Sequence, residues 1–364
     1  MGLILAGIAV VCIWAWPNRK PAVAPAHGPD DEWPDPVVAN PGYLGPDACV
    51  ACHAERVAEF RRTNHYHACR RPEDSPMPPG FTQGRGAVPT DMPGLHFEMT
   101  RSGDSFVHTS VNAAPTGEQR LTDRISLAFG AGGLDEVYFA WRGDLLYELP
   151  VAWLHPLDRW GHNPLRKYYS GDYARTGTGR CQECHNTWFE QIPGSVNRYR
   201  PESFILGVTC ERCHGPGREH VAFHQAHPRA DSTHAIINPA RLSRERLLEV
   251  CTQCHSNAVG SRGPRFAYRP GEPLADYFRI LETRHPEDDH VANQVTYLRQ
   301  SKCFQRSDTL TCTTCHNPHR QTDHAAVRRS CLSCHEPAAC RERPRVPAAV
   351  RDDCAGCHMP PRVW

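Results

Sequence analysis

The stretch Cys49-Val-Ala-Cys52-His53 recurs, with different middle residues, along the whole length of a 364-residue chain. Chance would produce about 0.05 such motifs in a chain of this composition, so a sevenfold repeat reflects function. The seven copies are Cys49-Val-Ala-Cys52-His53, Cys181-Gln-Glu-Cys184-His185, Cys210-Glu-Arg-Cys213-His214, Cys251-Thr-Gln-Cys254-His255, Cys312-Thr-Thr-Cys315-His316, Cys331-Leu-Ser-Cys334-His335 and Cys354-Ala-Gly-Cys357-His358. They are called motifs 1 to 7 below.

This pattern is the attachment site of a c-type haem. Two thiols three residues apart reach the two vinyl groups of one porphyrin, and the adjacent histidine then lies under the iron as its proximal ligand. We therefore predict seven covalently bound haem c groups. The predicted proximal ligands are His53, His185, His214, His255, His316, His335 and His358.

Zinc sites and thioredoxin-like redox pairs also use Cys-x-x-Cys. A zinc ion would need two such pairs and no fixed histidine after each. A redox motif occurs once, near a βαβ pattern. Neither alternative explains a histidine after every one of seven pairs.

The motifs use 14 of the 18 cysteines. Cys12 lies in the apolar N-terminus. We expect Cys69, Cys303 and Cys340 to fill apolar space or to form one disulfide rather than to act as catalytic thiols. Thioether formation requires export to an oxidising compartment, so we expect a bacterial protein that is periplasmic or faces the cell surface.

The N-terminus agrees with export. Gly2 to Trp16 is an uninterrupted apolar run, short for a membrane span and suited to a signal-peptide core. We expect residues 1–20 to be an export signal that is retained as a membrane anchor, with cleavage after Ala22-Val-Ala24 as the alternative. Residues 21–45 are rich in proline and alanine and are expected to form a tether.

The formal charge of the chain is only +1, which gives no indication of nucleic-acid binding. Haem propionates would make the holoprotein acidic. Nearly all basic residues are arginines, since Lys20, Lys167 and Lys302 are the only lysines. Guanidinium groups suit buried propionates, and a coding bias toward arginine explains the same count equally well.

Motif spacing divides the chain. His53 and Cys181 are separated by 127 residues, whereas the later gaps are 24, 36, 56, 14 and 18 residues. Gaps this short cannot build a separate core around each haem, so neighbouring haems must touch. We expect a first haem segment at residues 46–93, a β module at 94–155 and a six-haem domain at 156–364.

The long gap contains two expected hairpins, at His96–Val111 and Val137–Trp153, each with a Gly-Asp turn. Helices are expected at Arg241–Val250, with Ser243 as the N-cap, and at His290–Phe304. Fold class is therefore expected to be mostly α with much irregular structure, organised around a haem array, with a small antiparallel β module between haems 1 and 2.

From Gly42 onward the chain resembles the multihaem c-type cytochromes related to the tetrahaem cytochrome c of ammonia oxidisers, which are often fused to tetratricopeptide repeats. The resemblance is carried by Gly42-Tyr-Leu-Gly-Pro-Asp-Ala-Cys49, Phe60-Arg-Arg-Thr-Asn-His65, Gly207-Val-Thr-Cys210-Glu-Arg-Cys213-His214-Gly-Pro-Gly-Arg-Glu-His220, Tyr268-Arg-Pro-Gly-Glu-Pro-Leu, Gln300-Ser-Lys-Cys303-Phe, Cys315-His316-Asn-Pro-His319 and Cys357-His358-Met-Pro. It implies closely packed haems with a second histidine on most irons.

The resemblance also implies which histidines are distal ligands. The candidates are His65, His162, His220 and His319, with His285 as a weaker one. His67, His224, His290 and His324 are reserves, and His96, His108 and His155 are expected to be structural. The chain departs from the family because Arg341 to Asp353 contains no histidine, no repeat domain follows Trp364, and Cys69 and Cys303 stand where methionine is common.

Two functions of different classes remain open. An iron with two imidazoles has no site for substrate and acts as an electron carrier. We expect a periplasmic conduit that takes electrons from a membrane quinol oxidase or other cytochromes to a terminal acceptor. The alternative is a multihaem enzyme that acts on a small nitrogen or sulfur compound at one open haem, although no motif carries the lysine that often marks such a haem.

Overall fold

Helix and strand occupy nearly equal shares of the structure, 31% and 27%. The expectation of a mostly helical fold was therefore wrong. The computed structural model describes residues 39–74, 76–81, 86–163, 175–256, 258–280 and 293–359, all within one compact unit, Asp35–Trp364. The N-terminal anchor prediction lies outside these residues. Within them, no helix is long and apolar enough to cross a membrane.

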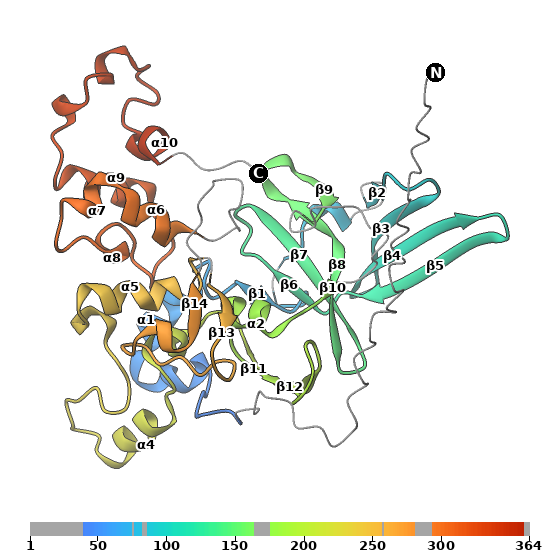
Figure 1. Cartoon of the computed structure of the whole chain (residues 1–364), viewed down its shortest axis with the longest axis horizontal. Coiled ribbons are helices and arrows are strands. Elements are labelled where there is room, and N and C mark those ends of the chain that lie inside the picture. Colours follow the sequence, from blue (N-terminus) through green and yellow to red (C-terminus); the bar gives the residue numbers. More distant parts are fainter. Residues whose placement is uncertain are drawn as a thin grey trace, which may run out of the picture. The chain divides into compact units, whose positions relative to one another are not determined.

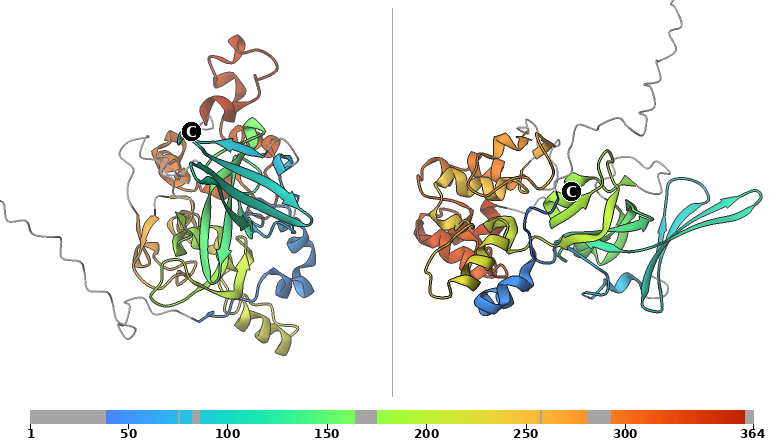
Figure 2. Two further views of the ribbon diagram at one scale, coloured as in Figure 1. Left: turned by 90° about the vertical axis from the view of Figure 1, so that its right-hand side faces the viewer. Right: turned by 90° about the horizontal axis from the view of Figure 1, so that it is seen from below.

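Two antiparallel sheets dominate the region between motifs 1 and 2 (Figure 1). The larger sheet has the strand order β1-β6-β7-β8-β10, with β9 paired to β8, and the smaller sheet has the order β2-β3-β4-β5. Their bounds are β1 Cys69–Arg70, β2 Ala87–Pro89, β3 Leu95–Ser102, β4 Ser105–Ala114, β5 Gly117–Arg124, β6 Leu127–Phe129, β7 Asp135–Arg142, β8 Leu145–Leu154, β9 Arg159–His162 and β10 Arg175–Thr176. The β4–β5 hairpin extends away from the helices (Figure 2).

Both predicted hairpins are confirmed. Ser102 pairs with Ser105 across Gly103-Asp104, and Arg142 pairs with Leu145 across Gly143-Asp144. Gly103 and Gly143 adopt φ of 59° and 65°. A two-residue hairpin turn requires this left-handed conformation at its first position, which glycine adopts without a steric penalty.

The larger sheet is covered on both faces. One face packs on the smaller sheet through Phe97, Met99, Leu149 and Val151. The opposite face packs through Phe139 and other residues on Trp188 and Phe189, which follow motif 2, and on Phe266, which follows motif 4. The sheet is therefore a wall whose second face supports the motif region.

Motif 2 continues directly into the hairpin β11 Asn186–Gln191 and β12 Tyr199–Leu206, and β13 Ala258–Ser261 pairs with β14 Phe278–Ile280. The helices are short. They are α1 Val50–Phe60, α2 Gly179–His185, α3 Cys210–His214, α4 Arg218–Ala226, α5 Arg244–Thr252, α6 Gln294–Gln300, α7 Lys302–Gln305, α8 Cys312–Cys315, α9 His324–Leu332 and α10 Cys354–His358. The 3-10 turns are η1 Pro46–Cys49, η2 Pro79–Phe81, η3 His155–Leu157, η4 Pro239–Arg241, η5 Leu274–Asp276, η7 Pro337–Ala339 and η8 Arg343–Arg345.

The predicted helix with Ser243 as its N-cap is confirmed as α5, because the Ser243 side chain accepts a hydrogen bond from the backbone N–H of Arg246. The helix expected at His290–Phe304 is divided into α6 and α7 in its described part. Ser301 ends α6 and caps α7 by accepting from the backbone N–H of Phe304.

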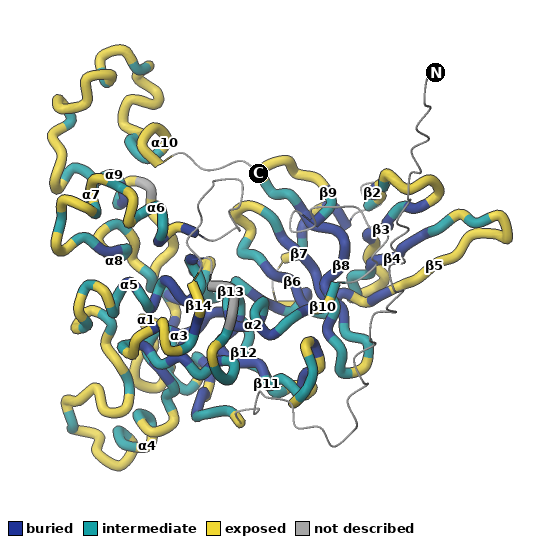
Figure 3. The backbone as a smooth tube through the Cα atoms, viewed as in Figure 1, coloured by how far each residue is buried: buried dark blue, intermediate teal, exposed yellow. Residues whose placement is uncertain are grey.

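Burial is uneven along the chain (Figure 3). The three apolar clusters draw their residues from positions 43 to 278. Within described residues 293–359, the buried apolar side chains are Val295 and Val327. This C-terminal part carries motifs 5, 6 and 7, and its polypeptide alone contributes little apolar core.

Candidate haem sites

Short helices carry the motif residues. Helices α2, α3 and α10 each end at the motif histidine, and α8 spans Cys312–Cys315. Residues three apart lie on the same face of a helix, so each helix presents both thiols on one side. In α1 the helical path breaks at His53, where φ is −124° and ψ is 36°. This arrangement suits two thioether bonds to one porphyrin edge.

Thiols of different motifs meet in pairs. A hydrogen bond to Cys210, followed by burial, raises the pKa of Cys49. A hydrogen bond to Cys254, followed by burial, raises the pKa of Cys184. A hydrogen bond to Cys251 lowers the pKa of Cys312 to about 7. Motif 1 therefore lies beside motif 3, and motif 4 lies beside both motif 2 and motif 5.

The same connectivity reaches the C-terminal motifs. Burial raises the pKa of Cys315, and the charge of Cys331 raises it further. Burial likewise raises the pKa of Cys331, and Cys354 adds to that rise. Motifs 5, 6 and 7 thus follow one another in space as they do in sequence, and the attachment sites form a connected array.

Three motif histidines are oriented by a hydrogen bond from the ring nitrogen Nδ1. His185 donates to the Ala68 carbonyl at 3.1 Å, His214 to the Ile237 carbonyl at 2.7 Å, and His255 to the Gln294 amide oxygen at 3.1 Å. An oxygen of this kind only accepts, so Nδ1 carries the proton and Nε2 keeps a lone pair. This is the tautomer that ligates a metal through Nε2.

Two of the predicted distal histidines lie opposite motif histidines. The ring centres of His65 and His255 are 6.0 Å apart, and those of His214 and His319 are 6.1 Å apart. Two metal–nitrogen bonds of about 2 Å, plus roughly 1 Å from each nitrogen to its ring centre, give about 6 Å between the centres of two axial imidazoles. Both pairs therefore have the separation of axial ligands.

Burial keeps these imidazoles in the neutral form that binds iron. Burial, and then the charges of His255 and His316, lower the pKa of His65 to about 4. Burial also lowers the pKa of His319, and His214 lowers it further. A neutral ring is available as a ligand at neutral pH without first losing a proton.

His220 lies in the same region. Its Nδ1 donates to the His234 carbonyl at 3.0 Å, so its Nε2 is available as a ligand. Burial lowers the pKa of His214, and both His53 and His220 act on it as neighbouring charges. His53, His214, His220 and His319 are therefore gathered from three parts of the chain.

Other predicted ligands, distal and proximal, lie elsewhere in the structure or outside its described residues. His162 ends β9, where its ring meets Phe97 edge-on with centres 6.4 Å apart. His335 and His358 are exposed. His285 and the reserve His290 lie outside the described residues.

The remaining histidines have other surroundings. His67 contacts Tyr66, and the Nε2 of His224 hydrogen-bonds to the Ser232 carbonyl at 2.9 Å. His324 begins α9. The histidines expected to be structural lie in or beside the sheets: His96 in β3, His108 in β4 and His155 in η3.

Sequence reasoning missed the middle residues of motifs 2, 3 and 4. Gln182, Glu183, Glu211, Arg212 and Gln253 are all buried. Their contacts tie the motif helices together. The sequence contains a signal for the burial of these residues. Motifs 1, 5, 6 and 7 have only apolar, small or hydroxyl residues between their two cysteines, whereas motifs 2, 3 and 4 have charged or amide residues there. A charged or amide residue inside a haem motif is thus a candidate for burial between motifs.

Glu211 connects motif 3 to the segment before motif 1. Its carboxylate accepts from the backbone N–H of Leu44 at 2.9 Å, of Gly45 at 2.7 Å and of Gly217 at 2.8 Å. Three backbone N–H groups thus donate charge-assisted hydrogen bonds to one buried carboxylate, and these bonds hold the segment before motif 1 against motif 3.

Haem fits this set of residues. The Cys and His donors have the required spacing, and three motif histidines present Nε2. The C-terminal helices lack an apolar core of their own, and porphyrin faces would supply one.

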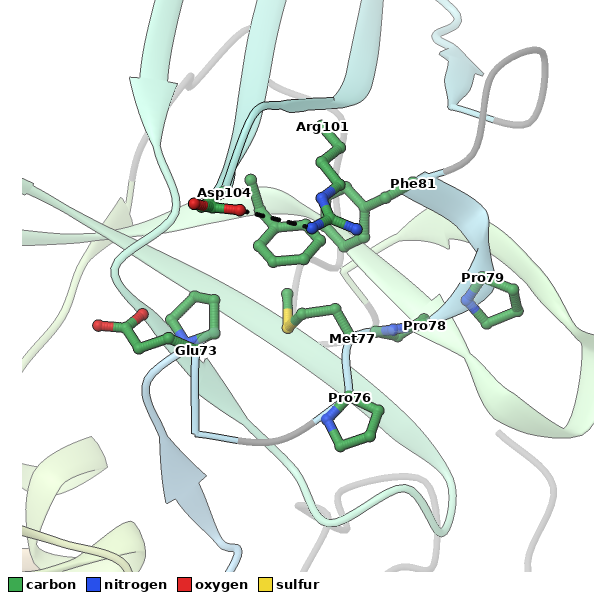
Figure 4. Close-up of a pocket in the computed structure, with 10 residues that line it drawn as sticks. Glu73, Pro76, Met77, Pro78, Pro79, Phe81, Arg101 and Asp104 are labelled. Atoms are coloured by element: carbon green, nitrogen blue, oxygen red, sulfur yellow. Dashed lines mark ion pairs between the residues drawn. The ribbon is translucent and has the colours of Figure 1, made fainter.

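One cavity in the described part of the chain lies away from the motifs. It has a volume of about 540 Å³ beside β3 and β4 and is lined by Met77, Phe81, Phe106 and neighbouring prolines (Figure 4). At its edge, Arg101 Nη2 lies 3.8 Å from Asp104 Oδ1. No predicted haem ligand lines it. A second cavity, of about 200 Å³, is lined by Cys315 and His316 of motif 5 together with Asp323 and Arg329.

Cys69 is buried, whereas Cys303 and Cys340 are exposed, and all three are free thiols. The apolar-filler prediction therefore describes Cys69 and not the other two. No disulfide joins cysteines within the described part of the chain.

Comparisons with known proteins agree with this chemistry. Residues 163–215 match the family model described as cytochrome c554 and c-prime. Cytochrome c-554 of Nitrosomonas europaea is 32% identical over 103 residues, which cover 26% of this chain and 43% of that protein. The multihaem cytochrome MtrA of Shewanella baltica is 24% identical over 197 residues, which cover 47% of this chain and 56% of that protein. The matches thus span about half the length of these relatives.

Two solved structures have a partial likeness. The outer cell wall cytochrome OcwA gives a TM-score of 0.44 at 18% identity, covering 66% of this chain and 45% of that one. The undecahaem cytochrome from the S-layer of Carboxydothermus ferrireducens gives 0.38 at 14% identity, covering 84% and 44%. The sequence matches and the motifs together relate this chain to the multihaem c-type cytochromes, and in particular to the tetrahaem cytochrome c-554 of ammonia oxidisers.

Proposed function

We propose that this protein is a heptahaem electron carrier in which most irons have two histidine ligands. Haem c supplies one-electron chemistry between the ferric and ferrous states. The observation that carries the proposal is the pairing of His65 with His255 and of His214 with His319 at about 6 Å. Two imidazoles on one iron leave no position for substrate.

Ligand assignments follow from these pairs. His65 and His255 would together hold the iron of the motif 4 haem, and His319 and His214 would hold that of the motif 3 haem. His214 lies near both His53 and His220. Because His214 is already paired with His319, His220 is assigned to the motif 1 haem.

Contacts between motifs support rapid transfer along the array. Motifs 1 and 3, 2 and 4, and 4 and 5 have neighbouring thiols, each of which shifts the pKa of its partner. Porphyrins attached at such sites would lie in contact with one another. The chain's own residues set the order of the carriers, and electrons enter and leave through redox partner proteins such as a membrane quinol oxidase or other cytochromes.

The proposed location is the periplasm, with residues 1–20 as a membrane anchor or a cleaved signal. Covalent attachment of haem c requires export, and the apolar run at Gly2 to Trp16 supports it.

Haem content tests the architecture. The intact mass of the exported protein is expected to exceed that of the apoprotein by seven haem masses. A count of five or fewer contradicts the proposed array.

One observation favours the alternative of an enzyme. His335 and His358 are exposed, and within the described residues no ring contact joins either to another histidine. Residues Arg341 to Asp353 also contain no histidine. His53 of motif 1 and His316 of motif 5 are exposed in the same way. One haem of these four motifs is therefore the candidate for an open iron that would bind a small nitrogen or sulfur compound.

Ligand titration separates the two functions. The purified protein is titrated with cyanide, nitrite and hydroxylamine while the high-spin absorption and electron paramagnetic resonance signals are followed. Uptake by no haem, or by one, agrees with a carrier that has at most one open iron. Uptake by two or more haems replaces the carrier with the enzyme.

A further inference from the structure

Arg212 stands where motifs 2, 3 and 4 meet. It is a middle residue of motif 3 and is 2% exposed. Its Nη2 donates to the Glu183 carbonyl of motif 2 at 3.0 Å, and its own carbonyl accepts from Gln253 Nε2 of motif 4 at 3.3 Å. Its guanidinium carbon lies 5.2 Å from the ring centre of Phe266.

The charge of Arg212 is poorly compensated. Its Nε has no hydrogen-bond partner, and no ion pair within the described part of the chain includes it. A guanidinium keeps its proton in proteins, so the group remains a cation throughout the accessible pH range. A buried cation of this kind is costly unless it is paired and fully hydrogen-bonded.

The carboxylate of Glu183 is shared by other arginines. Glu183 accepts from Arg265 Nη1 at 3.0 Å and from the backbone N–H of Phe266 at 2.9 Å. Arg180 Nη1 lies 3.8 Å from the same carboxylate. Two guanidinium groups therefore contact this carboxylate, and Arg212 contacts the backbone carbonyl of the same residue.

Motif thiols lie within the field of this cation. Arg212 directly precedes Cys213 in the chain, and its guanidinium contacts the carbonyl of Glu183, which directly precedes Cys184. The Cys254 Sγ also lies 4.0 Å from the Glu183 carbonyl that Arg212 contacts. The cation is thus adjacent to attachment positions of three haems.

We propose that Arg212 raises the reduction potentials of the haems attached through motifs 2, 3 and 4. A ferric haem carries one more positive charge than a ferrous haem, so a nearby fixed cation disfavours the ferric state. Burial leaves the interaction largely unscreened by water and salt. Two histidine ligands place a haem low in the potential range, and Arg212 offsets this for the group at the centre of the array.

This inference rests on the proposed carrier function. It adds that the haems of the array differ in reduction potential. Electrons would collect at the central haems around Arg212 rather than distribute evenly. Motifs 5 to 7 have no charged residue between their cysteines.

Charge variants test the proposal in the full-length holoprotein. Arg212→Gln is expected to lower the equilibrium constant for one-electron reduction of at least one haem by about tenfold, which is 59 mV for such a couple. Arg212→Lys retains the charge and is expected to keep most of the wild-type behaviour. Glu183→Gln removes the shared carboxylate and is expected to shift the same haems in the opposite direction.

The measurement is a potentiometric titration followed by absorption and electron paramagnetic resonance. Arg200→Gln is the matched control, because Arg200 is exposed and pairs with Glu190 on the surface. The control should titrate like the wild type. Opposite shifts for Arg212→Gln and Glu183→Gln support the proposal. Shifts of the same sign, no shift in either variant, or a lysine variant that matches the glutamine variant overturn it.

If Arg212→Gln fails to accumulate with haem, the sign of the Glu183→Gln shift decides, because the glutamine can still accept from the Phe266 backbone N–H. Failure of the proposed function has a different outcome: the wild type itself would lack the expected low-spin haems. A wild type with normal low-spin titrations and unresponsive variants contradicts only the role of Arg212.

Discussion

His65 provides the sharpest test at the scale of a single residue. Its ring lies 6.0 Å from that of His255, and burial lowers its pKa to about 4. We expect His65→Met to raise the potential of one haem, because a thioether disfavours the ferric state relative to imidazole. The measurement is a potentiometric titration with a low-spin spectrum recorded at each step.

His227→Met is the matched control for this variant. His227 is exposed, and its Nδ1 donates to the Phe223 carbonyl at 3.0 Å. The control should leave every haem unchanged. Identical titrations for His65→Met and the wild type would remove His65 from the set of ligands.

Glu211 is a second residue whose role can be measured. Its carboxylate accepts hydrogen bonds from three backbone donors, at Leu44, Gly45 and Gly217. Hydrogen bonds to a charged group contribute about 1.5–3 kcal/mol each, so we expect Glu211→Ala to lower the free energy of unfolding by about 3 kcal/mol or more. Thermal or denaturant unfolding of the holoprotein measures this loss.

The control for Glu211 is Glu219→Ala in α4, since Glu219 is exposed. Its effect should stay within about 0.5 kcal/mol, as for most surface substitutions. Equal stability of the two variants would show that the hydrogen bonds of Glu211 to the segment before motif 1 do not stabilise the folded protein.

Strand β8 offers the test at the scale of an element. Leu146 belongs to the cluster that contacts the motif 2 region, and Leu149 belongs to the cluster between the two sheets. Both side chains are fully buried, so truncation to alanine should lower the free energy of unfolding of each variant by about 2–5 kcal/mol. Only Leu146→Ala is expected to change the spectrum of a haem, because only its face of the sheet supports motif 2.

Each variant is the control for the other. Unfolding experiments establish that the two stabilities fall by similar amounts, and absorption spectra are compared at a temperature where both remain folded. A spectrum that changes equally in both variants would contradict the assignment of separate roles to the two faces.

Elements also differ in how far the sequence predicts them. The β3–β4 and β7–β8 hairpins were predictable because a Gly-Asp turn and alternating strands lie within a short stretch. Strand β1 was not, because Cys69 pairs with Phe129, sixty residues later. Strand β10 likewise pairs Arg175 with Glu148. Such two-residue strands form only when the rest of the sheet is present, and for this reason the strand content was underestimated.

Acid sensitivity is a property of the whole molecule. Burial lowers the pKa values of His65, His214, His255 and His319 below the ordinary value of about 6.5. The unfolded chain therefore binds more protons than the folded chain below pH 6.5, so stability falls as the pH decreases. For His65 the loss extends from pH 6.5 down to about 4.

We expect the free energy of unfolding to decrease by up to about 1.4 kcal/mol per pH unit for each histidine that is neutral only in the folded state. Denaturant unfolding at pH 7, 6 and 5 measures this slope. His65→Met should reduce the slope, whereas substitution of the exposed His227 should not. A stability that is constant, or that rises toward pH 5, contradicts the prediction.

The sequence by itself determined the chemistry of this protein. The Cys-x-x-Cys-His pattern is local: two thiols and an imidazole lie within five residues, and their spacing alone selects a c-type haem. The sequence also identified His65, His220 and His319 as ligand candidates, through their resemblance to the cytochrome c-554 relatives. It gave no means to choose between them and His162, which the structure leaves within the sheets.

Only the tertiary structure decided which motifs meet and which histidine faces which. His65 lies opposite His255 across 190 positions of sequence, and Cys49 contacts Cys210. The burial of Glu183, Glu211 and Arg212 between motifs depends on the same distant contacts. Contacts of this kind arise when segments pack around a common core. No local pattern specifies them, because the two residues of each pair are far apart in the sequence and neither is marked by its sequence neighbours.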